Sequence, residues 1–248
     1  MARACGAVLV VWAAIQTDPL LAEATKGYKH PWADFREGST VTIRETVRRP
    51  EIDEKGDLVQ RAVPTEFVWT VTAIVGDQVT LRVVQGEQDD EIPYHTRPPQ
   101  WFRGKAESKG REEVAVGTRK FDCAVTSIAF DSGKDVSQRT TVWKAAGAPS
   151  WAVRVRVETL TRGALTTSED ERLVALEERV RVGAKEVLCA VVEVTTEAAG
   201  QGKSVRKEWR SDEVPGRVVR RETRHFQGGK ENTLAYTQME VVSFKARK

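Results

Sequence analysis

Three pairs of adjacent glutamate and threonine residues come closest to a catalytic arrangement in this sequence, because two carboxylates held together can perform acid–base chemistry. The pairs are Glu45/Thr46, Glu158/Thr159 and Glu222/Thr223. Glycoside hydrolysis needs two carboxyl groups about 5 to 10 Å apart, one of them with a raised pKa. Nothing in the spacing provides this, and Arg156 and Arg220 precede two of the glutamates by two residues. Cross-strand ion pairs on a solvated sheet surface are the simpler interpretation, each worth at most about 1 kcal/mol.

Other catalytic and metal-binding patterns are also missing from the sequence. The histidines His30, His95 and His225 stand in unrelated contexts, and no serine lies in a Gly-x-Ser-x-Gly frame. No Cys-x-x-Cys pair or His/Cys cluster indicates zinc or redox chemistry. The acidic run at residues 87–91 lacks the glycine and the spaced terminal glutamate of a calcium loop. We therefore expect a protein that is not an enzyme, with no catalytic residue, no cofactor and no metal site.

The chain repeats itself with an offset of 66 residues. The stretch VGTRKFDCAV begins at Val116, and the similar stretch VGAKEVLCAV begins at Val182. The same offset relates the pairs Cys123/Cys189, Trp143/Trp209 and Pro149/Pro215. Repeats of this size indicate stacked supersecondary units that share one core. We expect four strands in each of the two full modules.

A partial third copy lies near the start of the chain. There TVTIRET at residues 40–46 is followed by a turn-rich insert and the apolar stretch EFVWTVTAIV. We expect one β domain over residues 25–248, divided into a partial first module (25–85), a loop (86–112), module 1 (113–180) and module 2 (181–248). The loop is predicted from its prolines, glycines and charged runs, and a loop of this length is often functional or mobile.

The repeated cysteines and tryptophans each allow two interpretations. In an oxidising compartment Cys123 and Cys189 could be joined by a disulfide that links the two modules, or they could be small buried thiols. Trp143 and Trp209 could line a concave apolar pocket or pack in the core, and Trp69 extends the same argument to the partial module. Both interpretations of the indoles predict apolar surroundings.

The charge balance of the chain excludes strong attraction to polyanions. The net charge of +3 results from 39 basic and 36 acidic residues, so the two signs nearly cancel. The stretch RVVRRETRHF places arginines beside Phe226, a combination that single-stranded nucleic acids can use. Surface arginines on a strand explain this run adequately, and we expect no nucleic acid partner.

The first 24 residues have the layout of a secretory signal peptide. A basic start at Arg3 is followed by an apolar run of about 12 residues and by the small-residue ending Ala22-Glu23-Ala24. As a helix the apolar run would span roughly 18 Å, which is short of the roughly 30 Å hydrocarbon core of a membrane. We predict cleavage before Thr25, no transmembrane segment afterwards, and a periplasmic or secreted protein. An uncleaved anchor and a buried N-terminal helix are the alternatives.

The remainder of the sequence predicts an all-β fold, because apolar residues alternate with a period of two and turn residues separate the runs. We expect an antiparallel meander of about 11 strands, near residues 39–48, 66–75, 78–85, 120–130, 136–145, 151–160, 170–180, 185–195, 203–210, 216–226 and 231–245. One helical turn is predicted at residues 30–36, where Pro31 precedes Trp32 and Phe35 on one face. A meander of this kind must curve or close to protect its faces.

Two segments resemble the tryptophan-to-proline hairpin of the periplasmic outer-membrane lipoprotein carrier superfamily and its exported bacterial relatives. They are TTVWKAAGAPSWAVRVRVET and KEWRSDEVPGRVVRRET. The resemblance implies a half-barrel, that is, a curved and incompletely closed sheet with a hydrophobic concavity. The arginines expected of the carriers are not located in this sequence, and a lipoprotein acylation site is absent.

From these features we expect an exported binding protein whose concave apolar face accepts a lipid-like or acylated ligand. The residues predicted to line this face are Trp69, Trp143, Val155, Trp209 and Val219. The alternative is a non-catalytic structural or interaction protein of the cell envelope. Such a protein would bind an envelope protein through an exposed edge strand or through the 86–112 loop.

Overall fold

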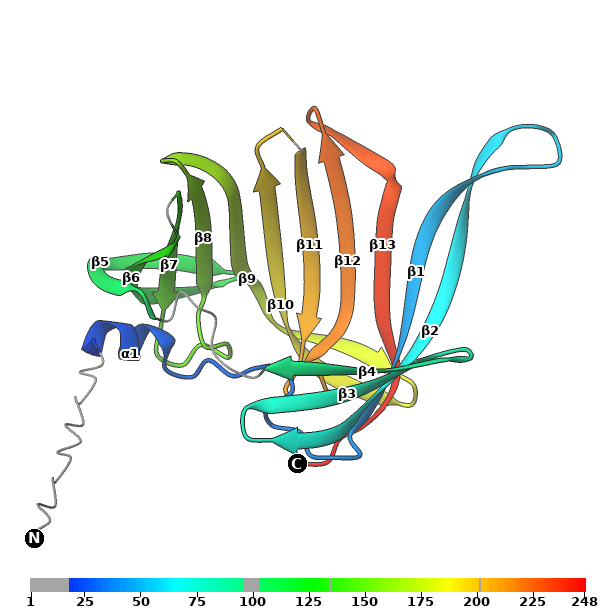
Figure 1. Ribbon diagram of the computed structural model, residues 1–248, viewed down its shortest axis with the longest axis horizontal. Coiled ribbons are helices and arrows are strands. Elements are labelled where there is room, and N and C mark those ends of the chain that lie inside the picture. Colours follow the sequence, from blue (N-terminus) through cyan, green and yellow to red (C-terminus); the bar gives the residue numbers. More distant parts are fainter. Residues whose placement is uncertain (1–17, 96–102, 134, 201) are drawn as a thin grey trace, which may run out of the picture.

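The computed structural model describes residues 18–95, 103–133, 135–200 and 202–248, most of which lie in β-strands (Figure 1). One short helix, α1 (Pro19–Thr25), precedes thirteen strands that form a single antiparallel sheet. The two outermost strands of this sheet each pair with only one neighbour, so the sheet is open. The predicted all-β, incompletely closed meander is therefore confirmed, with thirteen described strands in place of about 11.

The strands follow one another along the chain with short connections. They are β1 (Thr40–Ile52), β2 (Leu58–Val75), β3 (Gln78–Gln85), β4 (Gln88–His95), β5 (Lys105–Val116), β6 (Arg119–Gly133), β7 (Val136–Lys144), β8 (Arg154–Thr161), β9 (Ala164–Val182), β10 (Lys185–Ala198), β11 (Gly202–Arg210), β12 (Val218–Gln227) and β13 (Lys230–Lys245). All eleven strands expected from the alternation are present. The two additional strands are β4 and β5.

The sheet has the order β4-β3-β2-β1-β13-β12-β11-β10-β9-β8-β7-β6-β5. Every neighbouring pair is also consecutive in the chain except one, because β1 pairs with the C-terminal strand β13. This pairing extends from Thr40 opposite Lys245 to Val47 opposite Thr237. It places the N-terminal hairpins beside the end of the chain and leaves β4 and β5 as the two edges. Figure 1 shows β1 and β13 side by side, with β3–β4 and β5–β6 running across the curved sheet.

The prediction of a loop over residues 86–112 is wrong. Gly86 adopts a positive φ of 57° in a tight turn, after which β4 pairs with β3, and β5 pairs with β6. Edge strands carry charged residues on both faces, because one side of each strand meets solvent and charge discourages pairing with other chains. Their sequences therefore lack the period-two alternation that identifies a strand. Residues 96–102 of the predicted loop lie outside the described part of the chain.

The two full modules have the same strand register. In module 1, Val125 on β6 lies opposite Trp143 on β7, which lies opposite Arg154 on β8. In module 2 the corresponding row is Val191, Trp209 and Arg220 on β10, β11 and β12. The predicted tandem repeat of four strands is thus visible in the hydrogen-bonding pattern itself.

The N-terminal strands continue the same pattern in space. Beyond β13, Val41 on β1 lies opposite Trp69 on β2, which lies opposite Val83 on β3. The stretch TVTIRET therefore occupies the position of the cysteine strands, although its sequence resembles the later Glu-Thr strands. The turn-rich insert that follows it extends β1 and β2 into a long hairpin arm, in which Ile52 is 70% exposed.

The core consists of three clusters. Cluster 1 lies between the N-terminal strands and module 2 and contains Trp32, Leu81, Cys189 and Trp209. Cluster 2 lies between module 1 and strand β10 of module 2 and contains Cys123, Trp143 and Val192. Cluster 3 joins α1 to β5, β6, β7 and β8 through residues Ala24, Ala106, Ile128, Val142, Ala152 and Val155.

The helical turn predicted at residues 30–36 is a hydrogen-bonded turn rather than a helix. The amide of Ala33 donates to the carbonyl of His30 (2.9 Å), and that of Phe35 donates to the carbonyl of Trp32 (3.2 Å). Trp32 and Phe35 are both buried, as the shared face requires. In the part of the chain that the structure describes, no helix is long and apolar enough to cross a membrane.

Gly216 allows a close approach between the β11–β12 connection and Trp32. Its φ is +78°, and a Cβ atom there would lie 2.8 Å from Cζ2 of Trp32. Gly147 has a φ of +77° but open space around it, so Gly147→Ala measures the conformational cost alone. We expect Gly147→Ala to lower the free energy of unfolding by about 1 kcal/mol and Gly216→Ala by roughly twice that or more. Urea unfolding followed by tryptophan fluorescence measures both values. Equal losses in the two variants would contradict the packing of Trp32 against Gly216.

Candidate functional site

The five residues predicted to line a ligand site do not line one cavity. Trp69, Trp209 and Val219 belong to or pack against cluster 1, Trp143 belongs to cluster 2, and Val155 belongs to cluster 3. Four of the five are buried, and Trp69 is partly buried. Val155 lies opposite Val142, the neighbour of Trp143, so Val155 and Trp143 point to opposite faces of the sheet.

In each of the two full modules the repeated tryptophan is a core residue whose indole N–H donates a hydrogen bond to a glutamate. Trp143 Nε1 donates to Glu112 Oε2 at 2.7 Å, and Trp209 Nε1 donates to Glu178 Oε2 at 2.6 Å. Each glutamate lies two strands away from its tryptophan and exactly 66 residues from its counterpart in the other module. The indole N–H groups are therefore satisfied by protein acceptors rather than left free for a ligand.

An arginine covers each of these indoles. The guanidinium of Arg154 lies 4.5 Å from the ring centroid of Trp143, and that of Arg220 lies 4.9 Å from the ring centroid of Trp209. Such cation–π contacts stabilise a pair by roughly 0.5–2 kcal/mol. Each repeated tryptophan lies opposite a valine of the neighbouring strand and has a cation over its ring. Core packing therefore explains the repeated tryptophan best.

Trp69 differs from the two other tryptophans. Its ring stacks on Trp32, with 6.0 Å between centroids and 14° between planes. Its buried Nε1 has no hydrogen-bond partner among the described residues. The stretch VVSFKARK at residues 241–248 contains no aspartate or glutamate, so the C-terminal end of β13 has no carboxylate side chain that corresponds to Glu112 and Glu178.

The two repeated cysteines are free buried thiols. Cys123 lies in cluster 2 and Cys189 in cluster 1, and each Sγ lies near the carbonyl two residues earlier. Burial raises the pKa of Cys189 to about 11 and also raises the pKa of Cys123. Of the two interpretations of these residues, the structure has the buried thiols and not the disulfide.

In two of the three Glu-Thr pairs the glutamate forms an ion pair with an arginine, and the three pairs do not form a carboxylate site. Arg156 contacts Glu158 at 2.8 Å, and Arg220 contacts Glu222. Each ion pair joins two residues of the same strand, whereas we expected ion pairs between neighbouring strands. Among the described residues there is no group of three metal-ligating side chains.

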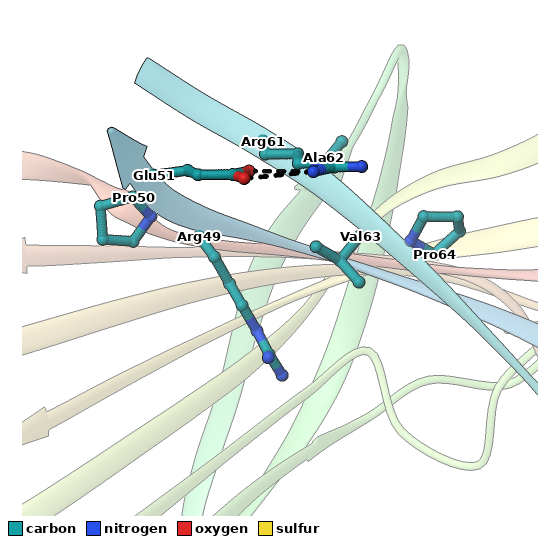
Figure 2. A pocket seen from close by; sticks show the side chains of 7 residues that line it. All are labelled: Arg49, Pro50, Glu51, Arg61, Ala62, Val63 and Pro64. Atoms are coloured by element: carbon teal, nitrogen blue, oxygen red, sulfur yellow. Dashed lines mark hydrogen bonds and ion pairs between the residues drawn. The ribbon is translucent and has the colours of Figure 1, made fainter. Parts of the chain in front are cut away.

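A shallow pocket of about 350 Å³ lies on the β1–β2 arm (Figure 2). Its lining residues are Arg49, Pro50, Glu51, Arg61, Ala62, Val63 and Pro64. The ion pair between Arg61 and Glu51, with nitrogen and oxygen 3.2 Å apart, crosses this pocket. Three of its seven lining residues are charged, and the ion pair lies across it, so this pocket is a poor site for an apolar ligand.

A larger hollow of about 790 Å³ lies where three neighbouring hairpins turn, and we call it the tip hollow. It is lined by Leu165, Thr166, Thr167, Ser168, Glu197, Ala198, Ala199, Gly200, Gly202, Lys203, Val205, Phe226, Gly228 and Gly229. Most of these residues are apolar or glycine, and Lys203 pairs with Glu197 at 3.5 Å among them. The expected strands place connections at residues 196–202 and 227–230, but sequence reasoning could not place these connections side by side.

A glycine shapes the tip hollow. Gly202 has a φ of +96°, and a Cβ atom there would lie 2.4 Å from the carbonyl oxygen of Phe226. The start of β11 and the end of β12 can approach so closely only because this residue has no side chain. The close approach brings Phe226 and Val205 into the same lining.

Comparison with solved structures returns the crystal structure of an outer membrane lipoprotein-sorting protein domain from Vibrio parahaemolyticus. The alignment covers 93% of each chain with 9% sequence identity and a TM-score of 0.35. This structure is from the class that the sequence motifs resemble, but a TM-score this low supports no argument about the site or the activity. No protein-family model and no curated protein matches the chain.

The bond between Trp209 and Glu178 can be tested by truncation. We expect Glu178→Ala to lower the free energy of unfolding by about 1–2 kcal/mol, because it leaves a buried indole N–H without its acceptor. Glu186 is a matched control, since it is an exposed glutamate of the same hairpin that pairs with Arg179. Glu186→Ala should cost less than about 0.5 kcal/mol. Urea unfolding measures both variants, and similar losses would exclude a structural role for the Trp209–Glu178 bond.

The state of the thiols can be tested by alkylation without reductant. Because the pKa of Cys189 is about 11, roughly one thiol in a thousand is ionised at pH 8, and burial blocks access as well. We expect iodoacetamide at pH 8 to leave Cys123 and Cys189 unlabelled in the native protein and to label both in denaturant. Peptide mass spectrometry locates the labels. Failure to label either residue in denaturant would indicate the disulfide.

Proposed function

We propose that this protein is an exported, non-catalytic binding protein that takes the acyl part of a lipid-like ligand into the tip hollow. The observation that carries this proposal is the tip hollow itself, with a volume of about 790 Å³ and a mainly apolar lining. Binding sites for small molecules have volumes of roughly 300–1,000 Å³ and are lined predominantly by apolar side chains. The open sheet provides such a hollow without an enclosed barrel.

The lining residues give the ligand its expected character. Val205 and Phe226 are partly buried, and Leu165 is 50% exposed, so apolar surface is available at the hollow. Covering apolar area contributes roughly 25 cal/mol per Å². Lys203 and Glu197 form the polar part of the lining, which suits a ligand with a polar group attached to the acyl chain. This lining replaces the predicted one, since Trp143 and Trp209 are hydrogen-bonded within the core and Trp69 stacks on Trp32.

Export to the periplasm or to the medium is supported by the leader-like residues at the start of the chain. In such a compartment an amphiphilic ligand needs a carrier or a receptor, because its acyl chain is poorly soluble in water. The balanced charges of the protein are compatible with a ligand recognised mainly through apolar contact. No step of this proposal requires a cofactor or a catalytic group.

The second candidate function is an interaction protein of the cell envelope, and one observation favours it. Strand β4 pairs only with β3, so its outer edge offers backbone groups to a strand of another protein. At the opposite edge, the amide of Ala106 on β5 already donates to Asp18. The charged residues of β4 make such pairing selective rather than general.

Ligand binding can be tested with a fluorescent fatty acid as the probe. We expect Phe226→Asp to weaken binding at least tenfold, because an acidic group in the hollow opposes burial of the acyl chain and removes apolar contact. Ile92 on β4 is 37% exposed and does not line the hollow, so Ile92→Asp provides the same chemical change as a control. Fluorescence titration measures both affinities, and the control should remain within twofold of the unmodified protein.

Native mass spectrometry of protein purified from its own envelope tests the same proposal without a chosen probe. A co-purifying lipid that is lost in the Phe226→Asp variant is the expected result. A chain recovered without lipid that also binds no fatty acid would remove the proposal and leave the interaction protein. Equal weakening by Phe226→Asp and Ile92→Asp would show that the hollow is not the site.

A further inference from the structure

Helix α1 has a capped first turn and one buried face that packs on the sheet. The side chain of Asp18 caps the helix by accepting the amide of Leu20 at 3.0 Å, and Pro19 occupies the first turn. Ala24 on its inner face is only 3% exposed and packs in cluster 3. Ala22, two residues earlier, is exposed to solvent. The short helix thus presents one defined face to the sheet.

Polar contacts tie one end of α1 to the edge strand β5 and the other end to strand β7 of module 1. Asp18 Oδ2 accepts the amide of Ala106 on the edge strand β5 at 3.2 Å. Lys144 Nζ donates to the carbonyl oxygens of Glu23 and of Lys26, the latter at 2.8 Å. These carbonyls lie at the C-terminal end of the helix, where a cation is stabilising. The side chain of Lys144 is 20% exposed, so the contact is largely shielded from solvent.

Module 2 has charged residues at the positions where module 1 receives α1. The register pairs Val142 with Thr126 and Val155, and it pairs Glu208 in the same way with Val192 and Arg221. The positions that correspond between modules 1 and 2 are Thr140/Arg206, Val142/Glu208, Lys144/Arg210 and Val155/Arg221.

In module 2 these residues form a network of ion pairs. Glu208 is 2% exposed and contacts Arg206, Arg210 and Arg221, and Arg210 also contacts Glu171 at 2.8 Å. In module 1 the same area is apolar, and its lysine has no acidic partner on the neighbouring strands and contacts α1 instead. An apolar patch on an open sheet needs a cover, and α1 is that cover.

We propose that α1 is a permanent part of the folded protein, a clasp on module 1, and that processing of the exported chain cuts before Asp18 rather than before Thr25. Cleavage before Thr25, which the Ala22-Glu23-Ala24 ending predicts, would remove the whole helix except its last residue. It would expose Ile128, Val142 and Val155 and leave the Ala106 amide without its acceptor. This proposal does not depend on the tip hollow or on its ligand.

Processing is tested by exporting the full chain with its own N-terminus from a bacterial host. Intact mass and N-terminal sequencing of the folded protein then locate the first residue. A first residue at or before Asp18 supports the proposal. A folded protein that begins at any residue after Asp18, Thr25 included, overturns it.

Two variants of α1 test, through their effect on the stability of the protein, whether the helix acts as a clasp. We expect Ala24→Asp to raise the equilibrium constant of unfolding at least tenfold, and Ala22→Asp to change it less than twofold. Both substitutions alter the small-residue ending, so intact mass must first confirm that both variants retain α1; a difference in stability then does not result from altered processing. Equal effects of the two variants would overturn the proposal.

Hydrogen exchange gives a readout that does not require Ala24→Asp to fold. Asp18→Ala should increase the exchange rate of the Ala106 amide at least tenfold, because that edge-strand N–H then has no acceptor. The amide of Leu173, which donates to the carbonyl of Val153 on a neighbouring part of the sheet, is the internal control and should not change. An unchanged Ala106 rate would show that α1 is not attached in solution.

Discussion

The pairing of β1 with β13 is the interaction on which the rest of this structure depends. It joins residues near the two ends of the chain, with Thr40 opposite Lys245, and so turns two tandem modules and the N-terminal hairpins into one continuous sheet. Without it, β13 and β1 would both be long edges with unpaired backbone groups. With it, the edges are the charged strand β4 and strand β5, which α1 partly covers.

The duplicated modules share a backbone pattern but use different side chains for different purposes. The indole, its glutamate and its arginine occur in both, and these contacts explain why tryptophan recurs at the same place. On the opposite face the modules diverge. The Glu208 network of module 2 corresponds to an apolar patch in module 1, so one surface is stabilised by ion pairs and the other by a docked helix.

Much of the fold is predictable from local patterns in the chain, and the failures have physical causes. Alternation predicts all eleven strands that have at least one packed face, β3 among them. It misses β4 and β5, because edge strands carry charge on both faces. The candidate site is less predictable from the sequence than the fold is. Trp69, Trp143, Val155, Trp209 and Val219 are core residues spread over three clusters, whereas Phe226 and Val205 of the tip hollow carry no signal that separates them from other strand residues.

The sequence by itself determined the class of fold, the repeat and the positions of the turns, because these depend on residues within a few positions of one another. Only the tertiary structure decided that the first strand pairs with the last, that three hairpin tips line one hollow and that α1 covers module 1. Each of these features joins segments far apart in the chain, as Asp18 and Ala106 are. Such contacts follow from how curved surfaces meet in space, and local periodicity contains no record of them.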